Sequence, residues 1–257
     1  RRRLARKRNM ETQSSDQIAS LDAKGLEHYY GKRKVLRGIS LTARSGEIVG
    51  LLGPNGAGKT TTFKILSGLM RPSKGAVLWQ DKDIGKLPIH KRARLGLGYL
   101  PQESSIFRAL TVEENLFVVL AHKGFARAQA RQRAEALLQE FELTRVAKQP
   151  SHTLSGGERR RLEIARALTA EPKILMLDEP FTGIDPITVD ELRRLLGKLS
   201  KQGLGIILTD HNARETLKVI DRSYLIYDGE ILIEGSAKEL LNDERARRYY
   251  LGWEMTL

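Results

Sequence analysis

The feature that most constrains the fold of this chain is a glycine-rich segment, Gly53–Thr60, with the spacing Gly-x-x-x-x-Gly-Lys-Thr. An apolar run before it, Ile48–Leu52, predicts a buried strand, and Thr61–Leu66 after it can form a helix. The glycines let successive backbone N–H groups point at one anion, and the helix adds the positive end of its dipole. A glycine-rich turn without a ligand is the alternative, but all four fixed positions and both flanks fit phosphate binding. The pattern therefore predicts a nucleoside-triphosphate site.

Individual positions of this segment have distinct expected roles. Lys59 can reach the β- and γ-phosphates, and the hydroxyl of Thr60 is placed to ligate Mg²⁺. We predict that the segment and the residue after it contact the nucleotide: Gly53, Pro54, Asn55, Gly56, Ala57, Gly58, Lys59, Thr60 and Thr61.

Length and composition limit the class of protein. The chain has 257 residues, which suits one large α/β domain or two small lobes. It contains no cysteine, so disulfides, thiol catalysis and cysteine metal sites are excluded. Its longest apolar runs, such as Leu116–Ala121, are far shorter than the roughly 20 residues of a membrane helix. If this protein acts at a membrane, we expect it to do so as a peripheral protein.

The start of the chain is strongly basic. The net charge is +13, and six of the positive charges come from Arg1, Arg2, Arg3, Arg6, Lys7 and Arg8. We interpret residues 1–17 as a solvated, disordered tail, because blocks of like charge repel one another. Attraction to anionic lipid headgroups and nonspecific contact with nucleic acid are the alternatives, with lipid the better candidate.

The rest of the chain alternates between strand and helix patterns. Lys173–Asp178 holds four consecutive apolar residues, which favours a central parallel strand covered on both faces. From Thr111 to about Lys148 the apolar spacing becomes helical, so we expect a helical lobe inserted into an α/β core. Asp228-Gly229 between two apolar runs predicts a β-hairpin. Further expected elements are a strand over Ser20–Leu26, a helix over Asp190–Lys201 and a basic helix from about Ala237 to Arg248.

Two acidic residues follow directly on the apolar strand. Asp178 and Glu179 stand at its carboxyl end, where open α/β sheets place their ligands. Asp178 is suited to hold Mg²⁺ through water, and Glu179 can activate a water molecule against the γ-phosphate. The alternative is an ordinary pair of acidic residues at a strand end.

A second helix start also carries glycines. Ser155-Gly156-Gly157-Glu158 has the Ser-x-x-Glu spacing of a capping box, which by itself indicates only a well-capped helix. The two glycines leave bare N–H groups at the positive helix end, which is an anion site in its own right. The chain thus offers two phosphate-binding helix ends, one on each side of the expected helical lobe.

Taken together, these motifs resemble the nucleotide-binding subunits of ABC transporters over about residues 20 to 240. The motifs in matching order are Gly53–Thr60, Gln102, Leu154–Glu158, Ile174–Glu179, Ile184-Asp185 and His211. The resemblance implies an ATPase that uses ATP and Mg²⁺ and has an α/β fold. The fold would be a RecA-like P-loop NTPase core with an inserted α-helical subdomain and an antiparallel β portion. The implied bounds are about 18–101 and 169–235 for the core, 102–168 for the helical subdomain and 236–257 for a C-terminal helical tail.

The resemblance also implies roles that pattern alone leaves open. It implies a head-to-tail homodimer in which Ser155–Glu158 of one copy contacts the ATP held by the other, with Ser155, Gly156 and Gly157 over the γ-phosphate. Tyr30 would stack on adenine, although it could equally be a packing residue. Gln102 would touch Mg²⁺ and the attacking water. His211 would bind the γ-phosphate, although a lone histidine after a strand is usually structural.

A closer resemblance is to the lipopolysaccharide-export ATPases of the LptB family. It rests on Leu100–Arg108, Ser155–Arg166, Thr209–Leu217 and Tyr250-Leu251-Gly252. It implies a peripheral protein on the cytoplasmic face of the bacterial inner membrane, without a specific nucleic-acid partner. Phe107 and Arg108 would lie in the groove that receives the integral membrane subunits.

Alternatives to this assignment stay open. Branched-chain amino-acid importer ATPases share much of the pattern, and a soluble ABC-type ATPase or an ATP sensor without hydrolysis are further readings. The sequence departs from the family at Thr182, where the family often has Ala, and in the extra basic residues 1–8. We expect neither departure to touch the chemistry.

Overall fold

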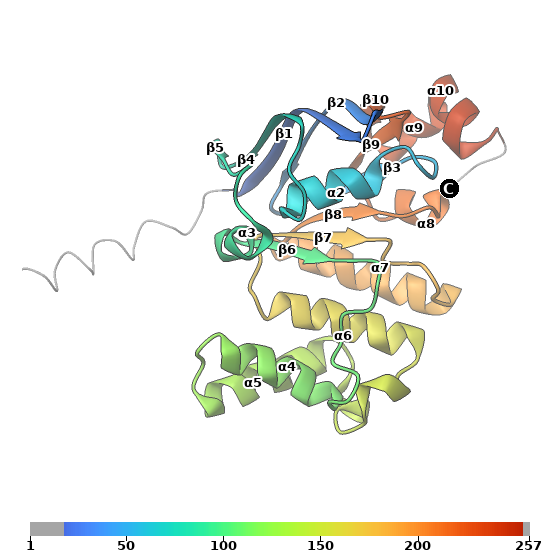
Figure 1. Cartoon of the computed structure of the whole chain (residues 1–257). Helices are drawn as coiled ribbons and strands as arrows, with labels where there is room; N and C mark the ends of the chain where they lie inside the picture. Colours follow the sequence, from blue (N-terminus) through green and yellow to red (C-terminus); the bar gives the residue numbers. More distant parts are fainter. Residues whose placement is uncertain (1–17, 254–257) are drawn as a thin grey trace, which may run out of the picture.

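Two β-sheets and the helices around them form the described part of the chain, residues 18–253 of a computed structural model (Figure 1). The predicted basic tail, residues 1–17, lies outside the described residues. Among residues 18–253, no helix is both long and apolar enough to cross a bilayer.

The larger sheet has the strand order β10-β9-β3-β8-β7-β6. Its strands are β3 (Ile48–Leu52), β6 (Leu97–Leu100), β7 (Ile174–Asp178), β8 (Gly205–Thr209), β9 (Arg222–Tyr227) and β10 (Glu230–Gly235). Every residue of β3, β7 and β8 is buried. For β7, which pairs in parallel with β6 and β8, this confirms the predicted central strand covered on both faces. β9 and β10 form the predicted hairpin, and both turn residues, Asp228 and Gly229, have positive φ angles.

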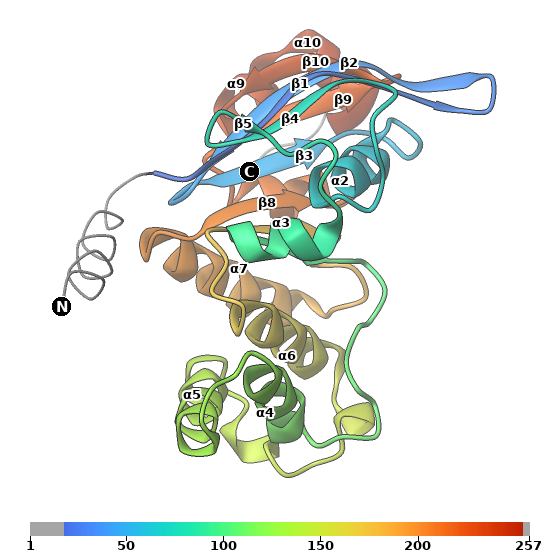
Figure 2. The same ribbon diagram turned by 60° about the vertical axis from the view of Figure 1, so that its left-hand side comes forward.

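The smaller sheet is antiparallel, with the strand order β2-β1-β4-β5. Its strands are β1 (Ser20–Tyr30), β2 (Arg33–Arg44), β4 (Lys74–Trp79) and β5 (Lys82–Asp83). β1 runs four residues beyond the predicted end at Leu26, because it pairs with β2 up to Tyr30. Helix α2 (Lys59–Ser67) lies between the two sheets (Figures 1 and 2).

Alternate residues of the central strand serve two separate cores. Val49 and Leu51 pack in one apolar cluster with Phe63 of α2 and with the antiparallel sheet. Ile48 and Leu52 face the other way, into a cluster formed with the remaining helices. This alternation follows from the period of two in a strand and places α2 opposite those helices.

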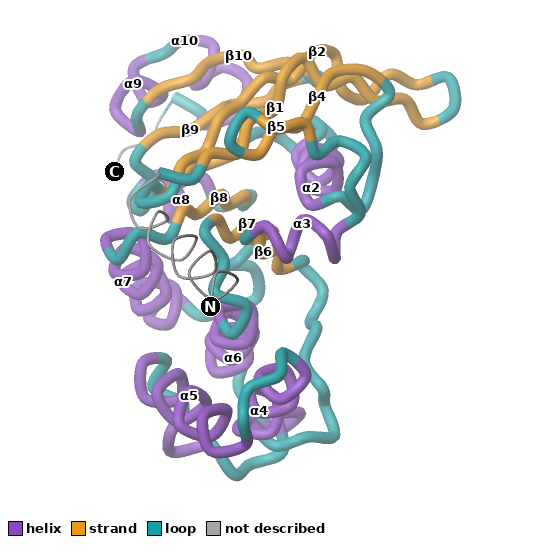
Figure 3. Tube along the Cα trace, turned by 90° about the vertical axis from the view of Figure 1, so that its left-hand side faces the viewer, coloured by secondary structure: helices purple, strands orange, loops and turns teal. Residues whose placement is uncertain are grey.

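The helices of the second cluster extend away from the larger sheet. α4 (Val112–His122) and α5 (Arg127–Glu140) lie at the end opposite the antiparallel sheet, and α6 (Gly156–Leu168) and α7 (Pro186–Lys201) lie between (Figures 1 and 3). The shorter elements are α3 (Ile89–Leu95), η1 (Thr144–Val146), η2 (Ser151–Thr153) and α8 (Ala213–Leu217). The helical pattern predicted from Thr111 onward is confirmed.

Two predicted helix boundaries are wrong. The helix expected over Asp190–Lys201 begins at Pro186, because Asp185 caps it and proline is favoured in the first turn. The single helix expected from Ala237 to Arg248 is instead divided into α9 (Ala237–Asn242), α10 (Glu244–Ala246) and η3 (Arg247–Leu251). Asp243 causes the break, because its backbone is extended and its side chain accepts the N–H of Ala246 at 2.9 Å, which starts a new helix.

Candidate nucleotide-binding site

The Gly53–Thr60 segment joins the carboxyl end of β3 to the start of α2. Gly53 has a φ angle of 146°, and a Cβ atom there would collide with the backbone oxygen of Ile226. Gly58 has a φ angle of 114°, and a Cβ atom there would come within 2.6 Å of Leu36. Only glycine fits both the backbone conformation and the space at these two positions. The local geometry therefore explains the spacing seen in the sequence.

Lys59 is the first residue of α2 and is buried. Its Nζ donates to the backbone oxygens of Gly53 (2.6 Å) and Pro54 (3.0 Å), so the ammonium group is held inside the loop. Burial lowers the pKa of Lys59, and the nearby charges of Glu179 and Asp178 act against this shift. A phosphate in the loop would offer this ammonium a charged partner in place of the two carbonyls.

A cavity opens beside the loop. Its lining consists of Tyr30, Arg33, Val35, Asn55, Gly56, Gly58, Lys59, Thr60, Thr61 and Glu179. Arg33 and Val35, at the start of β2, were not among the predicted site residues, although Arg33 stands in the basic turn that follows Tyr30. Tyr30 is half-exposed, and its hydroxyl donates to the sulfur of Met70 at 3.6 Å. The predicted contacts Gly53, Pro54 and Ala57 shape the loop without lining the cavity in the described chain.

Asp178 ends strand β7 and is buried. The hydroxyl of Tyr99, on the neighbouring strand β6, lies 3.4 Å from its Oδ2. Burial raises the pKa of Asp178, and the charge of Glu179 beside it raises that pKa further. A bound cation would oppose both effects, because it stabilises the buried negative charge.

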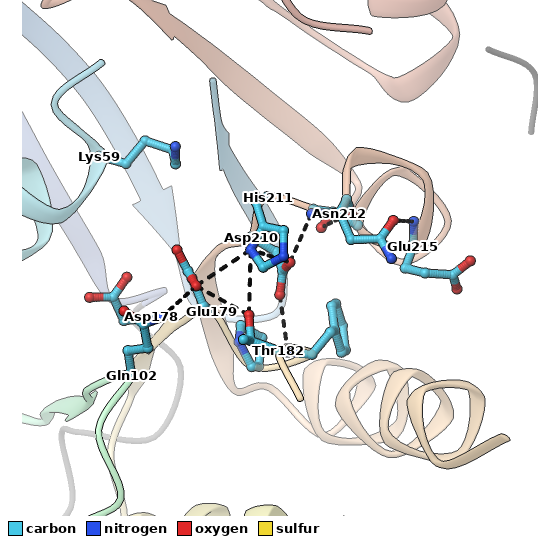
Figure 4. A network of polar contacts seen from close by, with 12 residues as sticks. Lys59, Gln102, Asp178, Glu179, Thr182, Asp210, His211, Asn212 and Glu215 are labelled. Atoms are coloured by element: carbon cyan, nitrogen blue, oxygen red, sulfur yellow. Dashed lines mark hydrogen bonds and ion pairs between the residues drawn. The ribbon is translucent and has the colours of Figure 1, made fainter. Parts of the chain in front are cut away.

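The carboxylate of Glu179 is the centre of a polar network (Figure 4). Its Oε2 accepts hydrogen bonds from Gln102 Nε2 (2.8 Å) and Thr182 Oγ1 (3.1 Å), and it lies 3.4 Å from His211 Nδ1. Gln102 follows β6, Glu179 follows β7 and His211 follows β8, so three adjacent strand ends meet here. The structure thus brings together three of the predicted site residues. Thr182, which we expected not to touch the chemistry, contacts this carboxylate through its hydroxyl.

Arg160 fixes the backbone on which Glu179 stands. It is buried in α6, and its guanidinium donates to the backbone oxygens of Asp178 (3.1 Å), Glu179 (2.7 Å) and Pro180 (3.1 Å). Glu163, also buried, pairs with it at 2.9 Å. Glu179 has a φ angle of 49°, which is uncommon outside glycine, so these bonds hold a strained turn in place. Nothing in the sequence indicates this role, because Arg160 is one of three consecutive arginines.

Asp210 stabilises the turn that carries His211. It is fully buried and accepts the backbone N–H groups of Phe181 (3.0 Å) and Asn212 (2.9 Å). Burial raises its pKa, whereas these two hydrogen bonds lower it. The hydroxyl of Tyr250 donates to the backbone oxygen of Asp210 at 3.3 Å, and burial raises the pKa of Tyr250 to about 12. The C-terminal region is therefore tied to the turn that carries His211.

The second glycine-bearing helix start is closed by its own side chains. Ser155 caps α6, and the reciprocal bonds of the predicted capping box are both present. Ser155 Oγ also donates to Glu158 Oε2 at 2.8 Å. A Cβ atom on Gly157 would collide with Thr188, so this glycine lets α6 approach the first turn of α7. Within the described chain, Ser155–Glu158 contributes nothing to the lining of the cavity beside Gly53–Thr60.

Comparison with known proteins identifies the family. Residues 36–182 match the family described as ABC transporter. The chain belongs to the ABC transporter family. It is an ATP-binding subunit and an ABC-type ATPase. Its fold is the P-loop NTPase fold predicted from the sequence.

Relatives of this ABC ATPase match it over nearly their whole length. The lipopolysaccharide export system ATP-binding protein LptB of Haemophilus influenzae is 50% identical over 241 residues, covering 93% of this chain and 100% of the relative. A probable ABC transporter ATP-binding protein of Azorhizobium caulinodans is 51% identical over 238 residues, covering 93% and 85%.

Solved structures of ABC cassettes share the fold. MJ1267 in its ADP conformation has a TM-score of 0.82 and 25% identity, covering 92% of this chain and 100% of that one. A dimeric cassette, MJ0796, has a TM-score of 0.75 and 28% identity, covering 84% and 98%.

Two predicted residues of the ABC ATPase lie apart from the cavity. Phe107 is 48% exposed, and the guanidinium of Arg166 lies 5.0 Å from its ring centre. The buried side chain of Asn115 holds both the N–H (2.8 Å) and the carbonyl (3.1 Å) of Phe107. Arg108 is exposed, and His152 Nδ1 lies 3.1 Å from its backbone oxygen. A rigid backbone thus presents an aromatic ring to the outside.

Proposed function

We propose that the cavity beside Gly53–Thr60 binds ATP and that Glu179 is the general base of hydrolysis. The observation that carries this proposal is the position of Glu179 in the lining of the same cavity as Lys59 and Thr60. The loop N–H groups and the start of α2 supply a positive environment for the β- and γ-phosphates. Tyr30, which precedes the loop in the sequence and lines the same cavity, offers a ring on which adenine can stack.

Hydrolysis requires a water molecule to attack the γ-phosphorus while the bond to the β,γ-bridging oxygen breaks. Glu179 accepts the proton of this water, and ADP leaves with the electron pair of the broken bond. Lys59 balances negative charge on the phosphate oxygens. His211 contacts the γ-phosphate, and Gln102 orients the attacking water.

Mg²⁺ bound with the nucleotide fits the oxygen donors at this site. Thr60 lines the cavity, and Asp178 is a buried carboxylate beside Glu179. Gln102 uses its Nε2 for the bond to Glu179, and its amide oxygen makes no hydrogen bond within residues 18–253. Among residues 18–253, no three His, Asp or Glu side chains form an all-protein metal site. An ion held by one or two protein ligands, phosphate oxygens and water needs no such cluster. When bound, Mg²⁺ neutralises charge on the phosphate oxygens.

We propose further that two copies pair head to tail, so that Ser155, Gly156 and Gly157 of one copy close over the γ-phosphate held by the other. Ser155 and Gly156 are exposed, which supports a role toward a second copy. The related cassette MJ0796 is dimeric. ATP then bridges the two copies, and hydrolysis followed by phosphate release removes the bridge.

The transport process that we propose is lipopolysaccharide export, with the ATPase on the cytoplasmic face of the bacterial inner membrane. The relative from Haemophilus influenzae that carries this name matches over its entire length. Phe107 and Arg108 are the proposed contacts with the integral membrane subunits, because the exposed ring is held on a fixed backbone.

Replacing Glu179 by Gln tests the assignment of the base. We expect ATP binding to stay intact, turnover to fall by roughly 10²- to 10⁴-fold, and an ATP-bound dimer to accumulate. Phosphate release and size-exclusion chromatography with ATP and Mg²⁺ measure the two effects. Glu171→Gln, which changes an exposed glutamate outside the cavity, serves as the control. Near-normal hydrolysis by the Glu179→Gln variant would contradict the proposal.

Mixing two inactive variants tests the head-to-tail arrangement. In a mixed dimer of Lys59→Met and Ser155→Arg copies, one composite site keeps both Lys59 and Ser155, so ATPase activity should return. Recovery is excluded if each copy builds its site from its own Ser155, and the absence of recovery would refute the arrangement.

Complementation tests the transport process. We expect the chain to restore growth and surface lipopolysaccharide in a Haemophilus influenzae strain depleted of its own LptB, and the Glu179→Gln variant to fail. Restoration of branched-chain amino-acid uptake in an importer mutant, without restoration of lipopolysaccharide export, would instead favour the importer alternative.

A further inference from the structure

Thr182 has a distinctive place in the polar network around Glu179. It lies in the turn between β7 and α7, and its backbone N–H donates to the carbonyl of Glu179 at 3.4 Å. Its Oγ1 lies 3.1 Å from Glu179 Oε2 and 3.5 Å from His211 Nδ1. One exposed hydroxyl therefore contacts both the proposed base and the histidine beside it (Figure 4).

The contacts of the Thr182 hydroxyl with Glu179 and His211 each have one possible hydrogen-bond direction. A threonine hydroxyl has one proton to donate and lone pairs that accept. The ionised carboxylate of Glu179 can only accept, so it takes the hydroxyl proton. The lone pairs of Thr182 then face Nδ1 of His211, which donates. The hydroxyl thus links the two side chains through complementary bonds.

The side-chain contacts of the Glu179 carboxylate in the described chain all end on one oxygen. Oε2 accepts hydrogen bonds from Gln102 and Thr182 and lies 3.4 Å from His211 Nδ1. The other oxygen points toward the side of the network on which Lys59 lies (Figure 4). A carboxylate anchored through one oxygen presents the second oxygen to the cavity, which is the orientation a base needs to take a proton from water there.

Two of the three donors have further duties in the proposed mechanism. Gln102 also orients the attacking water, and His211 also contacts the γ-phosphate, so the hydrogen bond of Gln102 and the contact of His211 with Oε2 are exchanged when nucleotide binds. Thr182 has no such duty and belongs to the same turn as Glu179. That turn is itself fixed, because the N–H of Glu179 donates to the Thr209 carbonyl at 2.8 Å.

We propose that Thr182 is a positioning residue that keeps Oε2 of Glu179 anchored while ATP is hydrolysed. The proposal rests on the proposed role of Glu179 as the base. Thr182 itself takes no part in the proton transfer. Its effect is on the orientation of the carboxylate, so it should act on the rate of the chemical step and leave ATP binding alone.

Valine and serine at this position separate the hydroxyl from the shape of the side chain. Thr182→Val keeps the volume and removes the hydroxyl. We expect kcat to fall roughly 3- to 10-fold with KM and ATP affinity unchanged, a smaller effect than loss of the base because the Glu179 carboxylate itself is kept. Thr182→Ser keeps the hydroxyl and should restore kcat to near the wild-type value. Melting temperatures of all three proteins establish that the fold is kept.

The outcomes distinguish the two proposals. A wild-type kcat in Thr182→Val, a raised KM in place of a lowered kcat, or a serine variant as slow as the valine variant would each refute the positioning role. If Glu179→Gln abolishes turnover in the same assays, the assignment of the base survives that refutation. If Glu179→Gln retains turnover, the assignment of the base fails, and the positioning role fails with it.

Discussion

The two glycine-bearing helix starts, at α2 and at α6, solve the problem of unpaired helix N–H groups in opposite ways. α2 is preceded by Gly58 in the left-handed region, and no side chain caps it and no acidic residue lies in its first turn. α6 is preceded by Ser155, which forms a complete capping box with Glu158. One helix start is open to a ligand, and the other is already satisfied.

This difference gives the two halves of the proposed composite nucleotide site different binding energetics. An anion at α2 adds partners to N–H groups that have no side-chain partner, so a single copy can bind ATP. An anion at α6 has to compete with Glu158, whose carboxylate holds both the N–H and the hydroxyl of Ser155. Engagement of α6 therefore needs additional free energy, which the closing of a second copy can supply.

Replacing Lys59 by Met should give the largest effect, because it removes the cation at the open helix start. We expect ATP affinity to fall by roughly 10²- to 10⁴-fold, since each charge-assisted hydrogen bond contributes about 1.5–3 kcal/mol. Isothermal titration calorimetry with ATP and Mg²⁺ measures this change. Ser155→Ala serves as the matched variant at the capped start and should bind ATP in a single copy as the wild type does. Equal losses of ATP affinity in the two variants would contradict the proposed difference between the two helix starts.

Alanine at Gly53 and at Gly157 should destabilise the fold for different reasons. At Gly53 the added Cβ meets a backbone oxygen and the φ angle is unfavourable, so we expect a loss of about 3 kcal/mol that no side-chain change repairs. At Gly157 the three atoms nearest to the added Cβ all belong to the Thr188 side chain, and we expect a loss of about 1–2 kcal/mol.

A second substitution distinguishes the two glycines. Thr188→Ala removes the colliding methyl group, so it should recover stability in the Gly157→Ala background and recover none in the Gly53→Ala background. Denaturant unfolding of the single and double variants measures this. Absence of recovery at Gly157 would mean that the backbone, rather than one methyl group, requires the glycine there.

Ser155→Ala should give the smallest effect on stability, and this effect should depend on pH. Loss of the cap costs about 1 kcal/mol, or about 2–4 °C in melting temperature for a chain of this size. The Ser155 hydroxyl lowers the pKa of Glu158 in the folded state. A lowered folded-state pKa adds stability above the unfolded-state pKa, and this stability is lost as the pH falls through the folded-state pKa.

The melting-temperature difference between wild type and Ser155→Ala should therefore be full at neutral pH and shrink in acid, as Glu158 takes up a proton. Differential scanning calorimetry at a series of pH values measures it. A difference that stays constant into acid would mean that the ionised carboxylate of Glu158 does not contribute to the cap.

Local features of the site could be predicted from the sequence. The strand–loop–helix around Gly53–Thr60, the capping box at Ser155 and the hairpin turn at Asp228-Gly229 each depend on residues close in the chain. Their chemistry is therefore readable from spacing alone. The break at Asp243 was also local, since an aspartate after an asparagine is a capping signal that the sequence contained.

Features that depend on several segments could not be predicted in the same way. Arg160 reaches carbonyls 18 to 20 residues away, and nothing distinguishes it from the arginines beside it until α6 packs against the end of β7. The proposed role of Thr182 depends on Gln102 and His211 converging on the same carboxylate oxygen of Glu179. The order of strands in the sheet sets such convergence, and local patterns do not contain it.

The buried guanidinium of Arg160 has a mechanical consequence. It belongs to the same helix as Ser155, and it grips the main chain on which Glu179 stands. A displacement at the start of that helix would therefore reach the main chain of Glu179 through Arg160. In the proposed dimer, the contact that one copy makes with its partner's nucleotide would then change the position of its own Glu179. ATP hydrolysis at the two sites would therefore be coupled.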